Sequence, residues 1–245
     1  MNPFILSLRQ IRYENRAFWR NPPAAFFTVV FPLIFLMIFN VLFGNEEFEV
    51  PGGTTTTSTF YVPAIVAFSV ISACFTNLAM GVSMARDRGL LKRARSTPLP
   101  TWGYLGGRVM HAMLVAFLLV GVVSVMGVTL YGVDIPTNTL PAFLIAVGVG
   151  AATFSMLGLA LTSIIPNADA SPAIVNGVIL PLLFISDIFI PMEDAPTWIT
   201  TAADVFPIRH FSIALRTAFN PFETGAGFEW GHLAVTAAWG LAGLA

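Results

Sequence analysis

The chain has 245 residues, of which 56% are hydrophobic and only 10% are charged. A soluble globular chain is roughly 25% charged, so this composition excludes an ordinary soluble protein and indicates an integral membrane protein. The formal net charge of −1 says little, because orientation in a membrane depends on where the charges lie along the chain. With Cys74 as the single cysteine, an intramolecular disulfide and a cysteine-based zinc site are both excluded.

Residues 1–22 have the pattern of a helix that lies in the lipid headgroup layer. A stripe of arginines runs beside an apolar face in this segment. Such a helix binds the anionic surface of a membrane. Asn21-Pro22-Pro23 then turns the chain into the bilayer. The residues expected to anchor the helix at the membrane surface are Arg9, Arg12, Arg16, Trp19 and Arg20.

Six apolar stretches follow, and their length and lack of strand-like alternation predict helices rather than a barrel. The last stretch is barely long enough, because a helix rises ~1.5 Å per residue and the hydrocarbon core is ~30 Å thick. We therefore expect an all-α membrane protein in which residues 23–245 form a domain with six transmembrane helices. The expected spans are about 24–43, 60–84, 109–131, 142–165, 173–190 and 230–245, with residues 44–59 as a loop between the first two.

The most informative stretch lies between the second and third spans. It contains five basic residues and one acid. As one helix over residues 86–96, it places Arg88, Lys92 and Arg95 on one side and its leucines on another. Pro98-Leu-Pro100 then ends the helix. The pattern predicts a short basic amphipathic helix that binds either lipid or a partner protein.

The distribution of Lys and Arg predicts the orientation. Four of the twelve lie in residues 1–22 and six lie in residues 86–108. The positive-inside rule then places the N-terminus and the basic stretch in the cytoplasm. The polar segment 191–229 is expected outside, as two short helices at or dipping into the outer membrane surface. Its Arg209 and Arg216 are a minor exception to the rule.

Enzymatic chemistry finds little support in the sequence. The lone lysine, Lys92, does not follow the glycine-rich pattern of a phosphate-binding loop, so no ATP hydrolysis is expected within this chain. A rhomboid-like intramembrane protease is a remote alternative, because the nearest nucleophile and base, Ser83 and His232, fall on opposite faces of the membrane. The remaining histidines, His111 and His210, are scattered along the chain, and we expect no metal site.

Polar residues inside membrane spans are costly and are therefore candidates for function. Aromatic residues on the second and fifth spans are candidates for lining an apolar cavity. Each also has a structural alternative: asparagines form hydrogen bonds between helices, worth ~0.6 kcal/mol each, and phenylalanines pack in the core or face lipid. The candidates for a substrate path are Phe68, Phe75, Asn77, Asn176, Phe184 and Asp187.

Three motifs in order resemble a known family. They are the run Arg86-Asp-Arg-Gly-Leu-Leu-Lys-Arg-Ala-Arg-Ser-Thr-Pro-Leu-Pro100, the arginine-rich N-terminal helix that leads into Asn21-Pro22, and Pro191-Met-Glu-Asp-Ala-Pro-Thr-Trp198 followed by Phe206-Pro-Ile-Arg-His210. The chain is similar along nearly its whole length to the permease subunit of bacterial ATP-binding-cassette exporters of the type-2 permease family, which includes daunorubicin and Nod-factor exporters.

The resemblance implies a bacterial plasma-membrane permease that pairs with a second copy or a related permease and binds two cytoplasmic ATPase subunits, which carry ATP and Mg. The substrate path would lie between the permeases, lined chiefly by the second and fifth spans. Residues 191–229 would form an external re-entrant or gate region. The coupling helix that contacts the ATPase would comprise Arg86, Asp87, Arg88, Gly89, Leu90, Leu91, Lys92, Arg93 and Arg95.

One position departs from the family pattern, since Ser186-Asp187 stands where the family often has Ser-Gly. An acid there could change the outer gate or favour a cationic substrate. The low charge and many aromatics of the spans favour an amphipathic or lipophilic substrate, such as a drug, lipid or glycolipid. The alternative function is an ATP-independent channel or secondary transporter, in which the basic stretch binds membrane lipid. We expect no nucleic-acid partner.

Overall fold

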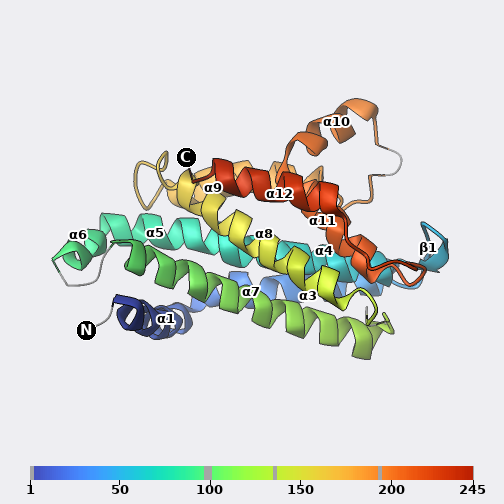
Figure 1. The fold of residues 1–245 in the computed structure, drawn as a ribbon, viewed down its shortest axis with the longest axis horizontal. Coiled ribbons are helices and arrows are strands. Elements are labelled where there is room, and N and C mark those ends of the chain that lie inside the picture. The colour runs from blue at the N-terminus through green and yellow to red at the C-terminus, as the bar shows by residue number, and fades with distance from the viewer. Residues whose placement is uncertain (1–2, 97–100, 135–136, 193–194, 245) are drawn as a thin grey trace.

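In the computed structural model, the chain forms an elongated bundle of helices (Figure 1). The structure describes residues 3–96, 101–134, 137–192 and 195–244, without the side chains of residues 3–8, 94, 95 and 101. The elements in chain order are α1 (Pro3–Trp19), α2 (Pro22–Ala25), η1 (Phe26–Val30), α3 (Phe31–Phe43), β1 (Glu47–Val50), β2 (Gly53–Thr56), α4 (Ser58–Ile71), η2 (Ser72–Asn77), α5 (Leu78–Asp87), α6 (Leu90–Arg95), α7 (Thr101–Tyr131), α8 (Leu140–Leu161), α9 (Ser171–Phe184), α10 (Thr197–Val205), α11 (Pro207–Phe219) and α12 (Trp230–Ala242).

Among the described residues, four helical segments are long and apolar enough to cross a membrane, and they correspond to the first four predicted spans. The fifth predicted span contains α9, a shorter apolar helix that ends at Phe184 rather than at residue 190. The mostly helical membrane protein expected from composition is therefore confirmed, while the count of six spans stays a prediction. The four segments are Pro22–Phe43, Ser58–Asp87, Trp102–Tyr131 and Leu140–Leu161.

The segment Ser58–Asp87, formed by α4, η2 and α5, is the centre of the bundle. In its apolar part 78% of the residues are buried, against 22% in Pro22–Phe43 at the bundle surface. It packs against α3, α7, α8 and α11. Gly158 of α8 allows the close approach, because a Cβ there would lie 3.0 Å from the Phe75 carbonyl oxygen. Small residues at helix contacts let backbones approach in this way.

Pro32 explains an irregularity in the first apolar segment. Proline cannot donate a backbone hydrogen bond and its ring collides with the carbonyl four residues earlier. The turn before it, η1, widens to π-helical geometry, which is one way a helix absorbs such a break. The segment therefore continues through Pro22–Phe43 without ending.

A β-hairpin replaces part of the loop predicted for residues 44–59. β1 and β2 pair antiparallel, with Val50 opposite Gly53. Asn220 Nδ2 donates to the Pro51 carbonyl oxygen at 2.9 Å, so the hairpin rests on the loop after α11. The prediction of a loop missed this hairpin because β1 alternates polar and apolar residues over only four positions and β2, with three threonines, has no apolar residue. The place where the hairpin rests depends on Asn220, which is distant in sequence.

The segment predicted as external contains two helices with different environments. α10 lies outside the bundle, whereas α11 packs between α4, α8 and α12 (Figure 1). Phe211 and Leu215 of α11 are fully buried, and Gly150 of α8 leaves room for the Phe211 ring. α11 is therefore part of the bundle and α10 lies at its surface, while the position of both helices at or in the outer membrane surface stays a prediction.

Candidate functional site

One end of the bundle carries α6 and α1, and the predicted coupling residues lie there (Figure 1). Arg86, on the last turn of α5, donates to the carbonyl oxygens of Thr162, at 2.8 Å, and Ile165. Asp87 accepts from the backbone N–H of Ala168. The last carbonyls of a helix have no partner within it, so Arg86 satisfies the C-terminus of α8, where a cation also interacts favourably with the helix dipole. These two residues join α5 to the turn between α8 and α9.

The predicted single helix over residues 86–96 is wrong. α5 ends at Asp87, Gly89 adopts a left-handed backbone with φ of +70°, and α6 begins at Leu90. Glycine tolerates this conformation because it lacks a Cβ, and a glycine after the last turn commonly ends a helix. The predicted arrangement of side chains on two faces failed because it assumed that residues before and after Gly89 belong to one straight helix.

The break at Gly89 presents α6 as a separate, exposed surface. Lys92 and Arg93 are exposed, Leu90 is 39% exposed, and Leu91 is half-buried. Arg88 is also exposed at the turn. The Arg95 side chain and the predicted stop at Pro98 and Pro100 lie outside the described residues. A short helix with two exposed cations and an apolar residue has the composition of a surface that contacts a partner.

α1 lies beside this end and packs along α7. Its anchor residues Arg9, Arg12, Arg16, Trp19 and Arg20 are exposed, while Phe18 is buried against the bundle. Glu14 pairs with Arg108 of α7, with 3.1 Å between Oε1 and Nε, and both side chains are largely buried. The ion pair fixes α1 to the third apolar segment, so the helix is held by protein contacts as well as by any contact with lipid.

A cavity of about 500 Å³ lies between α1, η2, α5 and α7. Asn77, one of the predicted substrate-path residues, is on its wall. The cavity also meets Arg20, Arg88 and His111. It is the place where polar side chains of the apolar segments and arginines of the basic end come together.

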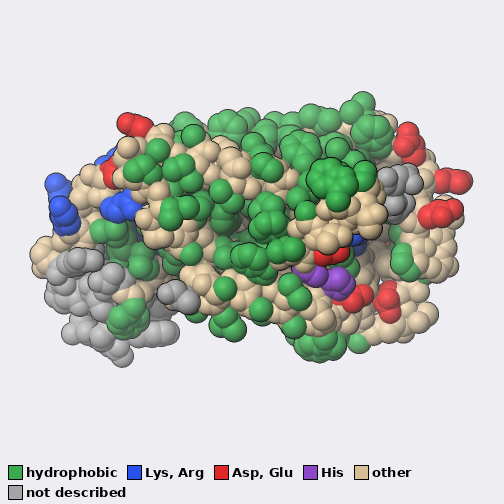
Figure 2. Space-filling view, turned by 90° about the horizontal axis from the view of Figure 1, so that it is seen from above, with side chains coloured by type: hydrophobic (Ala, Val, Ile, Leu, Met, Phe, Trp, Pro, Cys, Tyr) green, Lys and Arg blue, Asp and Glu red, His purple; other side chains and the backbone are tan. Residues whose placement is uncertain are grey.

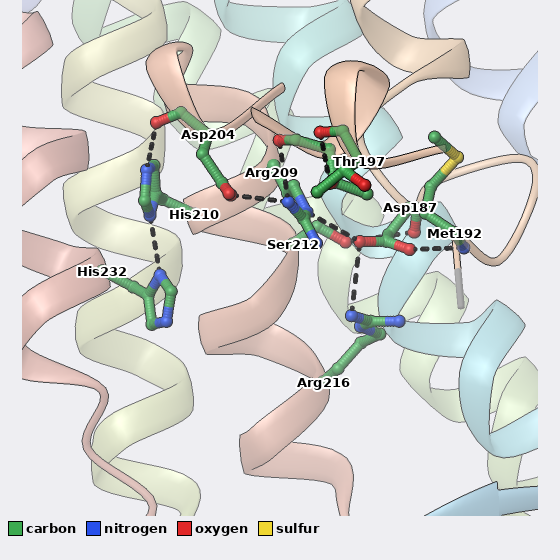
Figure 3. Close-up of polar contacts among 10 residues, drawn as sticks. Asp187, Met192, Thr197, Asp204, Arg209, His210, Ser212, Arg216 and His232 are labelled. Atoms are coloured by element: carbon green, nitrogen blue, oxygen red, sulfur yellow. Dashed lines mark hydrogen bonds and ion pairs between the residues drawn. The ribbon is translucent and has the colours of Figure 1, made fainter. Parts of the chain in front are cut away.

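The other end of the bundle contains a second cluster, which we call the outer cluster: Asp187, Asp204, Arg209 and Arg216 (Figure 3). The Asp187 side chain is 5% exposed and its Oδ2 lies 3.2 Å from Arg209 Nε and 3.6 Å from Arg216 Nη2. Its Oδ1 accepts from the Met192 backbone N–H at 2.8 Å. A largely buried carboxylate needs such partners, so Asp187 joins the chain after α9 to α11.

The backbone of Asp187 is unusual as well. Its φ is +56°, a left-handed conformation, and no other non-glycine residue in the described part of the chain has a positive φ. Glycine adopts this conformation without strain, and aspartate tolerates it better than most residues. A glycine would fit this backbone but would leave Arg209 and Arg216 without their shared acid.

Arg209 extends the outer cluster to α10. Its Nη1 donates to Asp204 Oδ1 at 2.6 Å and to the Thr200 carbonyl oxygen at 3.0 Å. His210 follows, with its Nδ1 2.7 Å from Nδ1 of His232 and its Nε2 2.8 Å from the Asp204 carbonyl oxygen. The two histidines are far apart in the sequence, and α11 and α12 bring them side by side (Figure 3).

The cluster does not form a recognisable metal or protease site. Within the described residues, no three His, Cys, Asp or Glu side chains are arranged to hold a metal ion. The Ser83 hydroxyl donates to the Ala79 carbonyl oxygen of its own helix at 2.9 Å, while His232 pairs with His210. Sequence reasoning had one signal for the outer cluster: Arg209 and Arg216 were the only cations in the segment that follows Asp187, and a buried acid requires a cation.

The remaining substrate-path candidates are divided between core and surface. Phe68 and Phe75 are buried, and the Phe68 ring packs against Phe189 with 5.4 Å between centroids. Phe184 is 50% exposed and Asn176 is half-buried, both on α9. The resemblance assigns the substrate path to the second and fifth spans. The second span, Ser58–Asp87, is largely covered by other helices of the chain, whereas α9 in the fifth span has an exposed apolar face.

Comparison with known proteins places the chain among permeases. Over 209 residues it is 27% identical to the daunorubicin resistance ABC transporter permease protein DrrB1 of Streptomyces coeruleorubidus, covering 82% of this chain and 70% of the relative. It is 25% identical over 206 residues to the putative transport permease ycf38 of Cyanophora paradoxa, covering 82% and 69%.

A third relative is longer. The probable multidrug ABC transporter permease YbhR of Escherichia coli K12 is 24% identical over 153 residues, which are 62% of this chain but only 41% of that protein. The chain therefore spans about two fifths of the length of that relative. The family model described as ABC-2 type transporter matches residues 8–220, and the chain belongs to this family of membrane transport permeases.

Proposed function

We propose that this chain is the membrane-spanning permease subunit of an ATP-driven exporter, with six spans and the N-terminus in the cytoplasm. Two permeases, identical or related, form the substrate path and bind two ATPase subunits that supply ATP and Mg. The distribution of charge supports this orientation. In Figure 2, Lys and Arg side chains gather mainly at the end with α6, most visible acids lie at the other end, and hydrophobic side chains cover the space between.

The observation that carries the proposal is the break at Gly89. It turns Leu90–Arg95 out of the long central helix, so a partner that contacts α6 acts at the end of the segment that occupies the bundle centre. Arg86 and Asp87 then join that end to the connection between α8 and α9. A displacement of α6 would therefore move α5 and the α8–α9 turn together, which provides a path from ATP binding to the helices that face the substrate.

For the substrate we propose an amphipathic or lipophilic compound. The exposed residues of α9, which include Val178, Leu180 and Phe184, are apolar, and an apolar face of this kind favours apolar ligands. Among the relatives, DrrB1 is named for daunorubicin resistance and YbhR as a probable multidrug permease. In the reconstituted complex, candidate compounds of this class should stimulate ATP hydrolysis. Stimulation by hydrophilic sugars alone would contradict the substrate class.

The coupling surface is tested with a charge reversal. We expect Lys92→Glu combined with Arg93→Glu to reduce co-purification of a co-expressed ATP-binding-cassette ATPase by about tenfold or more, because reversed charges at an interface repel the partner. The matched control is Arg12→Glu with Arg16→Glu, which changes charge equally on the exposed face of α1. Equal loss in both variants, or retention of the ATPase by the α6 variant, would contradict the coupling role and favour an ATP-independent channel or transporter.

A further inference from the structure

We propose that the cavity between α1, η2, α5 and α7 is a binding site for the phosphate of an anionic phospholipid. It is about 500 Å³ in volume, which is within the size range of small-ligand sites. Its location at the basic end of the bundle, beside the membrane-surface helix α1, is where a lipid headgroup would lie. The assignment to the cytoplasmic leaflet rests on the orientation proposed above, whereas the site itself does not depend on ATP coupling.

Charge at the cavity favours an anion. Arg20 and Arg88 line it, both are exposed, and neither forms an ion pair within the described residues. The acid on the wall, Glu14, is already paired with Arg108 and accepts from Gln10 Nε2 at 2.8 Å. Two unpaired guanidinium groups therefore remain to meet a phosphate, whose oxygens suit the planar guanidinium fork.

The inner wall carries polar groups that lack partners. His111 is 6% exposed, and its Nε2 is buried with no hydrogen-bond partner in the described part of the chain. The Asn77 amide, which enters from η2, also forms no hydrogen bond to the described residues. Because His111 Nε2 is closed off from solvent, the unpaired polar group that the cavity offers to a ligand is the Asn77 amide, and buried polar groups are normally satisfied.

The rest of the wall distinguishes a lipid from a free phosphate ion. Ala17, Phe18, Leu78, Met84 and Leu90 line the same cavity. Met84 and Leu90 are partly exposed, so the apolar wall continues to the surface beside the arginines. A ligand with a phosphate and an adjoining apolar portion would match both parts, whereas inorganic phosphate would leave the apolar wall unused.

The test uses the purified full chain in detergent and short-chain lipids that stay soluble. We expect dihexanoylphosphatidylglycerol to bind, and the variant Arg20→Gln with Arg88→Gln to weaken that binding about tenfold, since charge-assisted hydrogen bonds to both guanidinium groups are lost. The matched control, Lys92→Gln with Arg93→Gln, removes two exposed cations of α6 that lie outside the cavity. It should retain the wild-type affinity within about twofold. Equal melting temperatures of the three proteins establish that folding is unchanged.

Two further ligands test whether the site binds the phosphate of a lipid or that of a soluble phosphate ester. Glycerol 3-phosphate should bind at least about tenfold more weakly than the lipid, because it lacks the acyl chains that would contact the apolar wall. Equal affinity for it, with the same loss in the Arg20/Arg88 variant, would overturn the lipid in favour of a soluble phosphate ester. Equal binding of dihexanoylphosphatidylcholine, or equal loss in the control variant, would overturn the site. None of these measurements involves an ATPase, so the result is independent of the coupling proposal.

Discussion

Arginine has different surroundings at the two ends of the bundle. At the end with α1 and α6, Arg12, Arg16 and Arg93 are exposed on helix surfaces. At the other end Arg209 and Arg216 both lie against Asp187, inside a network that joins three segments (Figure 3). Exposed pairs contribute little to stability, while a buried acid with two cations is costly to disrupt. The comparison indicates that the first end is suited to contact other molecules and that the second holds the chain together.

Arg86 differs from the exposed arginines of the basic end. It belongs to the basic end, yet its guanidinium group donates to the carbonyl oxygens of Thr162, at the end of α8, and Ile165, in the turn that follows. Its neighbour Arg88, two residues on, is exposed. The basic end therefore contains both a structural arginine and arginines available to a partner, and substitutions should separate the two kinds.

The largest effect is expected at Asp187. Asp187→Ala leaves Arg209 and Arg216 without their shared acid and places a Cβ-bearing residue at φ of +56°, so unfolding in mixed micelles should show a loss of about 3 kcal/mol. Asp187→Gly is the matched variant, because it removes the same carboxylate and relieves the backbone; it should lose about 1 kcal/mol less than alanine. If both variants were as stable as the wild type, the outer cluster would not be holding the chain together.

An intermediate effect is expected at Arg86. Arg86→Gln removes the charge-assisted hydrogen bonds to Thr162 and Ile165, and the free energy of unfolding should fall by about 2 kcal/mol. Arg88→Gln, which removes an exposed arginine from the adjoining turn, should change it by less than about 0.5 kcal/mol. Urea or detergent titration of the two proteins side by side provides the measurement. A loss as large at Arg88 as at Arg86 would contradict the division between structural and exposed arginines.

The smallest effect is expected at Gly89. An added Cβ meets no atom within 4 Å there, so Gly89→Ala should destabilise by only about 1 kcal/mol, from the positive φ alone. Gly106→Ala is the control: it lies within α7 with equal space around it and should stabilise by about 0.5 kcal/mol through helix propensity. Thermal unfolding in detergent should show a lower melting temperature for Gly89→Ala and a higher one for Gly106→Ala. A stabilised Gly89→Ala protein would indicate that α5 and α6 can form one continuous helix.

Periodicity located the long apolar helices well, because burial in lipid or in the bundle demands runs of apolar residues wherever they occur. The break between α5 and α6 was missed, although Gly89 was in view, because an isolated glycine permits a left-handed turn without requiring one. The pair His210–His232 was missed because the two residues come from different helices, and a local pattern does not report such contacts. The hairpin β1–β2 is local, but its strands have only four residues each and β2 contains no apolar residue, so the alternation that identifies strands is too short to be decisive.

The sequence by itself determined that this is a helical membrane protein with its cations concentrated near the N-terminus and after the second span. Those properties follow from composition and from the cost of placing charge in a bilayer. Only the tertiary structure decided which arginines are held within the bundle, that Asp187 is paired, and that α11 is buried while α10 is exposed. Those outcomes depend on which helix faces meet, and a one-dimensional pattern of apolar residues does not specify the partner of each face.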